Sequence, residues 1–422
     1  MVRLGRRAKV PTKRGVQRLL WLALATIGFL TRRKSSEPRL VAGNSAIRRI
    51  LVIRLDLLGD VVLSLPAVRA LHRAYPAAQI DMLVLAGNSS LVKGDPDITT
   101  VYSYDPSPWR RPHTAVSPRT WYTGWSLIKS LRARQYDLVL SVSGDIASII
   151  TKLAGGRRQV GYEKEAYPFF LSDPVPGGRY RTRMHEVEYV LRLARAAGGL
   201  VEPGDELLKL WVDPSAAERI GQRLRDARRA LNRHGPVVAI HPGARNGHAK
   251  RWPVGHIADL ANHLSHDLDA VIVLTGTPGD APIVNAVTSN IHEPVFDLTG
   301  QTSIPELVAL LDACDVVVSG DSGPMHMACA VRTPVVALHG PTDPAISGPV
   351  APDAIVMRQP IWCSPCYDAS ATAECRFDNP VCMKAIMPRM AYAAVKRQLA
   401  RQDTTHEQEA ETITHTSTQV HP

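Results

Sequence analysis

The sequence lacks a hydrophobic segment long enough to cross a bilayer. Its most apolar charge-free run, Leu19–Leu30, has twelve residues, whereas a membrane-spanning helix needs about 20. Thr-Arg-Arg-Lys follows at 31–34, where a secretory signal would carry small residues for cleavage. We therefore expect residues 1–45 to form a basic, apolar extension that anchors at a membrane surface. The alternative is a disordered leader with little role.

The sequence also lacks a broad cationic excess. Its formal net charge is +11, but residues 1–40 carry eleven Lys and Arg against one acid, so the remaining residues sum to +1. Nucleic-acid-binding domains spread positive charge over the folded body. The distribution argues against such a body, and we expect no nucleic-acid partner.

The length predicts two domains. A chain of 422 residues, 45% hydrophobic and 21% charged, exceeds one ordinary domain and suits two packed α/β domains. We place an N-terminal domain at 46–212 and a C-terminal domain at 213–402, because a stretch with Gly, Pro and a charged helix at 200–235 separates two alternating patterns. Residues 403–422 have no apolar period, which predicts a disordered tail.

The first alternating pattern predicts a parallel sheet. Residues 50–53 form an apolar strand-like run, and apolar residues from 61 to 71 recur at helical spacing in a helix that Pro66 should kink. Gln79–Leu85 predicts the next strand, which completes a βαβ unit and implies parallel pairing.

The rest of the chain continues the alternation. After Tyr102–Tyr122, expected to be a long functional loop rich in Pro, Trp and Arg, we expect a helix near 127–133 and a strand at 137–142. The second half predicts strands at 237–241, 270–275, 295–298, 316–319 and 334–338, separated by helices at 253–264, after Pro282, at 304–313 and at 325–330.

The candidate site residues lie where predicted strands end, the edge at which ligands bind in open α/β sheets. The first motif runs from Arg54 to Val61. In it, Gly59 lets the backbone approach a ligand, and Asp60 opens the following helix. Asp60 is a candidate reactive carboxylate or simply a helix cap, since acids are favoured in first turns.

The second motif follows the strand at 237–241. His241, Gly243 and Ala244 precede Lys250, and a Gly-containing turn with exposed N–H groups beside fixed cations suits a diphosphate. Lys250 can then neutralise the charge that grows on a leaving phosphate. The alternative is an ordinary strand–turn–helix with solvated cations.

Two further strand ends carry polar residues. Gly276 and Asp280 follow one strand, and the Asp280 carboxylate can accept from ribose hydroxyls. Asp321 follows another, and Ser322 and Gly323 place backbone donors at a helix start, where a phosphate would fit. His326, one turn further on, is either a ligand contact or a core histidine.

In their order and spacing these motifs resemble glycosyltransferase family 9, the ADP-heptose:lipopolysaccharide heptosyltransferases. The resemblance covers residues 49 to about 358 and is strongest at Gly59-Asp60, 250–253 and 321–326, with a further match at 339–344. It implies a GT-B fold, in which two Rossmann-like domains with parallel sheets face each other across a cleft. It also implies metal-independent, inverting transfer of a heptose from a nucleotide diphosphate donor, ADP-heptose, to a lipopolysaccharide core or other glycolipid acceptor.

The resemblance assigns roles as well. Asp60 matches the general base that deprotonates the acceptor hydroxyl, and Lys250 matches the lysine that stabilises the departing nucleotide diphosphate. The loop before Lys250 and the Asp at 280, where Glu is usual, depart from the family pattern. The expected donor-binding residues are Gly59, His241, Gly243, Ala244, Gly276, Asp280, Asp321, Ser322, Gly323 and His326. No cofactor is expected, because the ADP-sugar is a substrate, and the cleft motifs contain no metal-ligand set.

Four of the six cysteines cluster in a loop at 361–383. Cys363, Cys366, Cys375 and Cys382 are separated by two, eight and six residues. Zinc binding, disulfides and free thiols all remain open, although a reducing cytosol disfavours disulfides. The other two, Cys314 and Cys329, are expected in the core.

Two other functions fit less of the sequence. A nucleotide-sugar epimerase of similar fold would need further acid/base groups, and a non-catalytic, membrane-docked nucleotide-sugar binding protein would not need Asp60 with Lys250. We therefore expect a monomeric transferase that is cytoplasmic and peripherally associated with the inner face of the inner membrane. Its expected partners are a nucleotide-sugar donor and a lipopolysaccharide-type acceptor.

Overall fold

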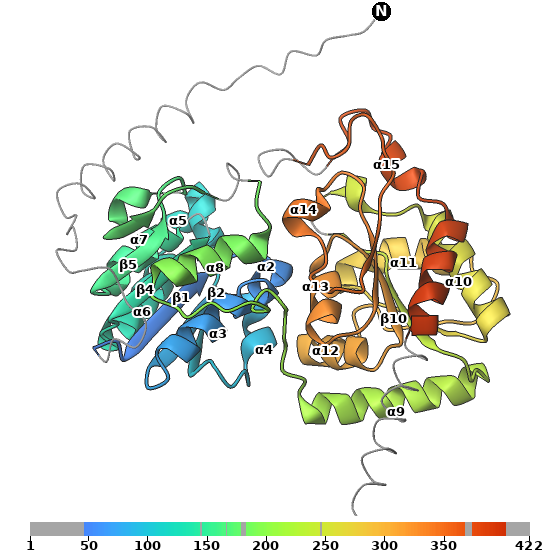
Figure 1. Cartoon of the computed structure of the whole chain (residues 1–422), viewed down its shortest axis with the longest axis horizontal. Helices are drawn as coiled ribbons and strands as arrows, with labels where there is room; N and C mark the ends of the chain where they lie inside the picture. The colour runs from blue at the N-terminus through green and yellow to red at the C-terminus, as the bar shows by residue number, and fades with distance from the viewer. Residues whose placement is uncertain are drawn as a thin grey trace, which may run out of the picture.

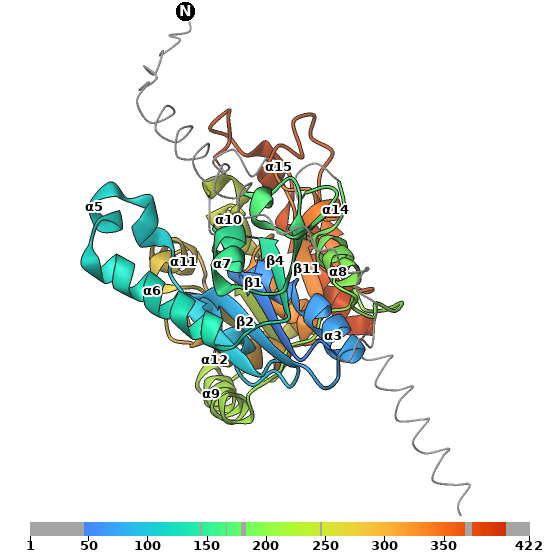
Figure 2. The same cartoon turned by 90° about the vertical axis from the view of Figure 1, so that its left-hand side faces the viewer.

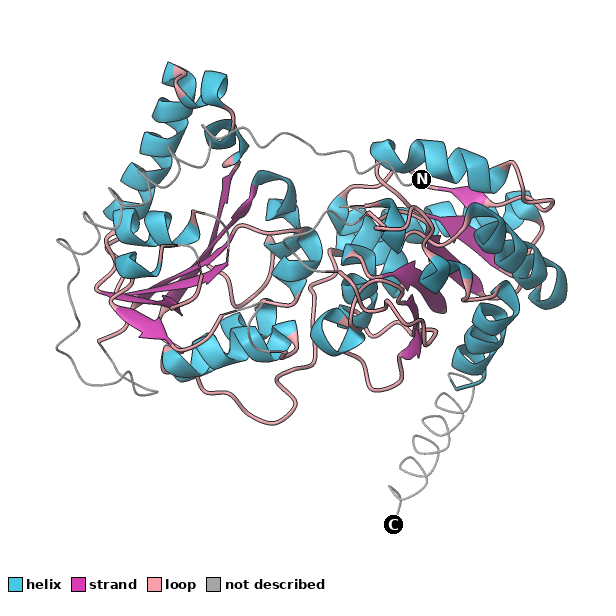
Figure 3. Ribbon diagram, turned by 90° about the horizontal axis from the view of Figure 1, so that it is seen from above, coloured by secondary structure: helices cyan, strands magenta, loops and turns pink. Residues whose placement is uncertain are grey.

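The computed structural model describes residues 46–143, 146–165, 167–178, 183–244, 247–367 and 374–401. The expected anchor at 1–45 and the expected tail at 403–422 lie outside these residues. The described chain forms two six-stranded sheets, side by side, each flanked by helices (Figures 1 and 3).

Every strand pairing in both sheets is parallel. In spatial order, the first sheet contains β3 (Thr100–Tyr104), β2 (Gln79–Leu85), β1 (Arg49–Arg54), β4 (Leu138–Ser143), β5 (Arg158–Tyr162) and β6 (Asp173–Val175). The second contains β12 (Ile355–Met357), β11 (Val335–Leu338), β10 (Val316–Gly320), β7 (Val237–His241), β8 (Val271–Leu274) and β9 (Phe296–Asp297).

The order of the strands reverses at the centre of each sheet. In the first sheet the reversal lies between β1 and β4, and in the second between β7 and β10. The loops that leave the carboxyl ends on either side of a reversal point diverge, which opens a crevice where ligands bind. The expected pair of Rossmann-like parallel sheets is confirmed. The domain boundary at 212/213 stays a prediction and falls just before α9.

Helices connect the strands and cover the sheets. With the first sheet are α2 (Leu58–Val62), α3 (Leu65–Ala74), α4 (Ser89–Val92), α5 (Pro112–Ala115), α6 (Pro118–Ala133), α7 (Ala147–Ala154) and α8 (Glu186–Ala196). The later helices are α9 (Pro214–Leu231), α10 (Val254–Leu268), α11 (Ala281–Thr288), α12 (Ile304–Asp312), α13 (Gly323–Ala330), α14 (Pro344–Ser347), α15 (Val381–Lys384) and a helix at 388–401. No described helix is both long and apolar enough to span a membrane.

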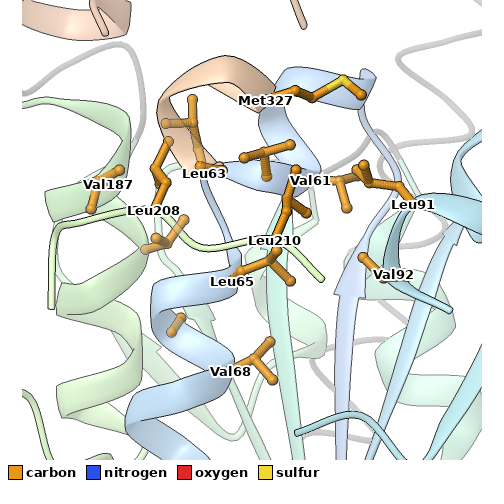
Figure 4. Packing of buried hydrophobic residues seen from close by; sticks show 14 of the residues in the cluster. Val61, Leu63, Leu65, Val68, Leu91, Val92, Val187, Leu208, Leu210 and Met327 are labelled. Carbon is orange, nitrogen blue, oxygen red and sulfur yellow. The ribbon is translucent and has the colours of Figure 1, made fainter. Parts of the chain in front are cut away.

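One hydrophobic cluster runs through both halves of the molecule. It joins β1, α2 and α3 of the first half to β7, α12 and α13 of the second. Figure 4 shows Met327 of α13 near Val61 of α2 and Leu63, which follows that helix, with Leu208 and Leu210 of the connecting segment beside them. The two sheets therefore share buried apolar surface next to the elements that carry the site.

Two local expectations were wrong. The helix expected to bend at Pro66 is broken instead: α2 ends at Val62 and α3 starts at Leu65, which puts Pro66 in a first turn, where its missing N–H needs no partner. The expected loop at 102–122 contains the end of β3, α5 and the start of α6.

Candidate active site

The candidate residues lie at the carboxyl ends of the central strands. β1 leads into Gly59 and Asp60, β7 ends at His241, and β10 leads into Asp321. Each of these strands adjoins the reversal point of its sheet, which is where ligands bind in folds of this kind.

Asp60 is held by an arginine inside the first sheet. The side chain of Arg54, the last residue of β1, is fully buried, and its Nη2 lies 3.3 Å from Oδ1 of Asp60, which is 17% exposed. The same nitrogen donates to Oε1 of Glu186 at 2.7 Å, and Nε lies 3.3 Å from Oδ2 of Asp56. One buried cation thus contacts three carboxylates and fixes the position of the base candidate.

The two halves touch at Gly59. A Cβ built on Gly59 would lie 2.9 Å from Cδ2 of His326 and 3.3 Å from Cα of Gly323. A side chain at 59 would therefore collide with the first turns of α13. This close approach is why the position suits glycine, and it brings together three predicted site residues from opposite halves.

Lys250 is held by two partners. Its Nζ donates to Oδ2 of Asp321 at 2.8 Å and lies 4.6 Å from the centre of the Tyr367 ring. Burial would raise the pKa of Asp321, but the charge on Lys250, together with His339 and His326, holds this pKa below its usual value. Asp321 is therefore ionised at neutral pH and positions the lysine.

The pKa of His326 is affected by charged groups from both halves. Burial lowers its pKa to about 4; the carboxylates of Asp321 and Asp60 oppose that shift, and His185 and His339 add to it. The ring is neutral at pH 7. Its Nδ1 is buried and has no hydrogen-bond partner in the described part of the chain.

The residues after β7 and β8 form a second group. A Cβ on Gly243 would meet the Asp280 carboxylate at 2.8 Å, and one on Gly276 would lie 3.0 Å from Cβ of Asp280. The His241 Nδ1 lies 3.0 Å from Thr275 Oγ1, and burial lowers the His241 pKa to about 4 despite Asp280 nearby. The four candidates His241, Gly243, Gly276 and Asp280 thus lie together, and Ala244 is buried next to them.

Asp280 also has a structural task. Its Oδ2 accepts from the backbone N of Thr277 at 2.9 Å and from Thr277 Oγ1 at 2.6 Å, which forms a capping box at a helix start. One carboxylate oxygen is therefore engaged locally, and a ribose contact at Asp280 stays a prediction.

A narrow crevice joins the two groups of the second half. Its lining includes His241, Gly243, Lys250 and Gly320. A larger groove of about 470 Å³ lies at the β12 edge and contains Arg358, Met390 and Arg397. None of the candidate residues lines that groove, so we place the site at the crevice.

Comparison with known proteins gives the family. Residues 124–376, more than half of the chain, match the profile of glycosyltransferase family 9 (heptosyltransferase). The chain belongs to glycosyltransferase family 9. It is 29% identical over 325 residues to lipopolysaccharide heptosyltransferase 2 of Escherichia coli (strain K12), which covers 74% of this chain and 88% of that protein.

Solved family 9 structures share the fold. The structure of E. coli ADP-heptose lps heptosyltransferase II matches with a TM-score of 0.65 and 24% identity, over 84% of this chain and 99% of that one. The glycosyl transferase family 9 structure from Veillonella parvula matches with a TM-score of 0.68 and 19% identity, over 84% and 97%. The expected GT-B fold is confirmed for this family 9 chain.

Three residues of the candidate site were not predicted from the sequence: Arg54, Glu186 and Tyr367. Arg54 had a visible signal, a charge that ends an apolar strand. Glu186 and Tyr367 had none, because each meets its partner from more than 100 positions away along the chain. Arg245 and Asn246, between Gly243 and Lys250, lie outside the described residues.

The cysteine loop contacts the segment that follows β11. The backbone N of Cys366 donates to the carbonyl of Pro341 at 2.9 Å. Within the described residues all six thiols are free, and no group of three potential ligands could hold a metal. Cys314 and Cys329 are buried, as expected for core residues.

Proposed function

We propose that this family 9 protein transfers a heptose from ADP-heptose to a lipopolysaccharide core acceptor with inversion. The proposal rests above all on one observation: the carboxylates of Asp60 and Asp321, from opposite sheets, both oppose the lowering of the pKa of the buried His326, and Asp321 also holds Lys250. The similarity to lipopolysaccharide heptosyltransferase 2 supports the choice of donor and acceptor class.

In the proposed reaction, Asp60 takes the proton of the acceptor hydroxyl as its oxygen forms a bond to the anomeric carbon. The bond from that carbon to the diphosphate breaks at the same time, and ADP leaves with the bonding electrons. Attack opposite the leaving group inverts the sugar carbon. Arg54 orients the base, and Glu186 fixes Arg54.

Lys250 supplies the positive charge for the leaving diphosphate. A cation already placed by Asp321 and Tyr367 requires little reorganisation in the transition state. We propose that Lys250 takes the part a divalent metal plays in other transferases, so that the reaction is metal-independent. Within the described residues, Nδ1 of His326 and Nε2 of His339 have no hydrogen-bond partner, and a bound nucleotide would supply one.

The remaining assignments follow from this arrangement. We propose residues 46–212 as the acceptor domain and 213–402 as the donor domain, with Gly59, His241, Gly243, Ala244, Gly276, Asp280, Asp321, Ser322, Gly323 and His326 as the donor site. The protein would act as a monomer on the cytoplasmic face of the inner membrane.

The test is Asp60→Asn, assayed with ADP-heptose and a heptose-deficient core acceptor. Transfer should fall by about 10² to 10⁴, while ADP affinity stays within about twofold because, apart from Gly59, the proposed nucleotide contacts come from the second half. Asp267→Asn, on the exposed end of α10, is the matched control. Wild-type transfer by Asp60→Asn would rule out the base assignment.

A further inference from the structure

A helical arm leaves the first sheet after β3 and projects from the body (Figure 2). It comprises residues 107–126, which include α5 and the first turns of α6. Trp121, Tyr122 and Trp125 are 61%, 73% and 69% exposed, and Val116 in the turn before α6 is 76% exposed. Trp121 and Trp125, four positions apart, share one face of the helix. Grouped large apolar side chains this exposed mark an interaction surface.

The arm is ordered by its own contacts. Thr120 Oγ1 donates to the carbonyl of Thr114 at 2.7 Å, and Thr114 Oγ1 donates to the carbonyl of Pro108 at 2.6 Å. Trp109 meets Trp121 edge to face with ring centres 5.1 Å apart. The aromatic side chains are thus held outward on a fixed frame.

The charge of the arm selects the partner. Residues 107–126 contain three cations, Arg110, Arg111 and Arg119, and no Asp or Glu. All three are exposed, as are Lys129 and Arg132 further along α6. Trp and Tyr favour the level of lipid headgroups, and cations beside them are attracted to anionic lipids. An amphipathic surface of this composition fits an anionic bilayer.

The position of the arm fits the reaction. The arm follows the carboxyl end of β3, and Asp60 follows the carboxyl end of β1; both strands run parallel in one sheet. A bilayer at the arm therefore lies on the same sheet edge as the proposed base. We infer that residues 107–126 dock the first sheet onto an anionic bilayer surface. The benefit to a lipid-linked acceptor rests on the proposed function; the docking itself does not.

The test uses the full chain with Trp121→Ser/Trp125→Ser. Co-sedimentation with phosphatidylglycerol-containing vesicles should weaken by roughly tenfold, because two indoles that would insert into the bilayer are lost. Trp211→Ser, a half-exposed tryptophan before α9, is the control and should bind like the wild type. Arg110→Gln/Arg111→Gln/Arg119→Gln should bind these vesicles more weakly and with a shallower dependence on salt than the wild type, because the cations at 1–40 are retained, and should bind phosphatidylcholine vesicles unchanged.

Two further readouts separate the explanations. The tryptophan variant should keep wild-type transfer to a water-soluble core oligosaccharide and lose rate only with vesicle-embedded acceptor. If the wild type transferred no heptose, the proposed function would be wrong, but the inference that the arm docks onto a bilayer would not be affected. Unchanged sedimentation of the tryptophan variant would overturn the docking inference, as would a concentration-dependent dimer or RNA binding that the same variant abolishes.

Discussion

Gly59→Ala should separate the two halves of the protein at the point where they meet. The new Cβ would lie 2.9 Å from Cδ2 of His326 and 3.3 Å from Cα of Gly323. Carbon atoms in contact normally lie about 3.5 to 4.0 Å apart. His326 is 4% exposed, so it cannot swing aside freely, and α2 and α13 must move apart by roughly 0.5 to 1 Å.

Two effects of this shift can be measured. Overpacking of this kind costs about 1 to 3 kcal/mol, so the denaturant midpoint should fall. Asp60 is the next residue and moves with Gly59, and a displacement near 1 Å can cost about 10²-fold in rate. We expect a loss of roughly 10- to 100-fold in kcat for heptose transfer.

The controls use other glycines. Gly323→Ala should be milder, because its Cβ would meet Gly59 N at 3.4 Å, an ordinary contact distance. Gly255→Ala, in α10 with no atom within 4 Å of the new Cβ, should leave kcat unchanged and stabilise by about 0.4 to 1 kcal/mol. Equal behaviour of Gly59→Ala and Gly255→Ala in both assays would refute the reasoning.

Three other outcomes follow from the site. Arg54→Lys keeps the charge but cannot bridge two carboxylates as a guanidinium does. The kcat for transfer should fall roughly tenfold, and ADP affinity measured by calorimetry should be unchanged. Full activity of the variant would show that Arg54 is not part of the site. Tyr367→Leu deletes the ring beside Lys250 and should lower kcat about 3- to 10-fold, in line with a cation–π contact of about 1 kcal/mol; an unaltered kcat would contradict it. The pKa values of His241 and His326 fall from 6.5 to about 4 on folding, so the unfolded chain binds more protons than the folded chain between these values. The free energy of unfolding should therefore be highest above pH 6.5 and decline towards pH 4. A denaturant midpoint that does not change between pH 6.5 and pH 4 would show that the two rings are not kept neutral.

Local patterns were enough to predict most strands. β2 and β7 match their expected bounds because each is a compact run with apolar, β-branched residues between turn signals. The motif residues were found because they follow such runs directly. The start of α6 was missed for a physical reason: residues 118–126 are almost all exposed, so they carry no apolar period for a helix to show.

Long-range partners were not predictable in this way. Arg54 and Glu186 are 132 positions apart, and the sequence around either residue does not indicate that the other is its partner. The same holds for Tyr367, whose ring lies beside Lys250 although more than 100 positions separate the two residues. Charge at a strand end predicted that a site exists there, but not which side chains hold its reactive groups.

The apolar cluster that continues from α2 into α13 limits how the molecule can open. Pulling the sheets straight apart would wet its side chains, at about 25 cal/mol for each Å² exposed. Rotation about this seam, by contrast, keeps it dry. We therefore expect a nucleotide sugar to enter by rotation of the two halves about this apolar contact. Surfaces far from the contact would move most, while Gly59 would stay close to α13.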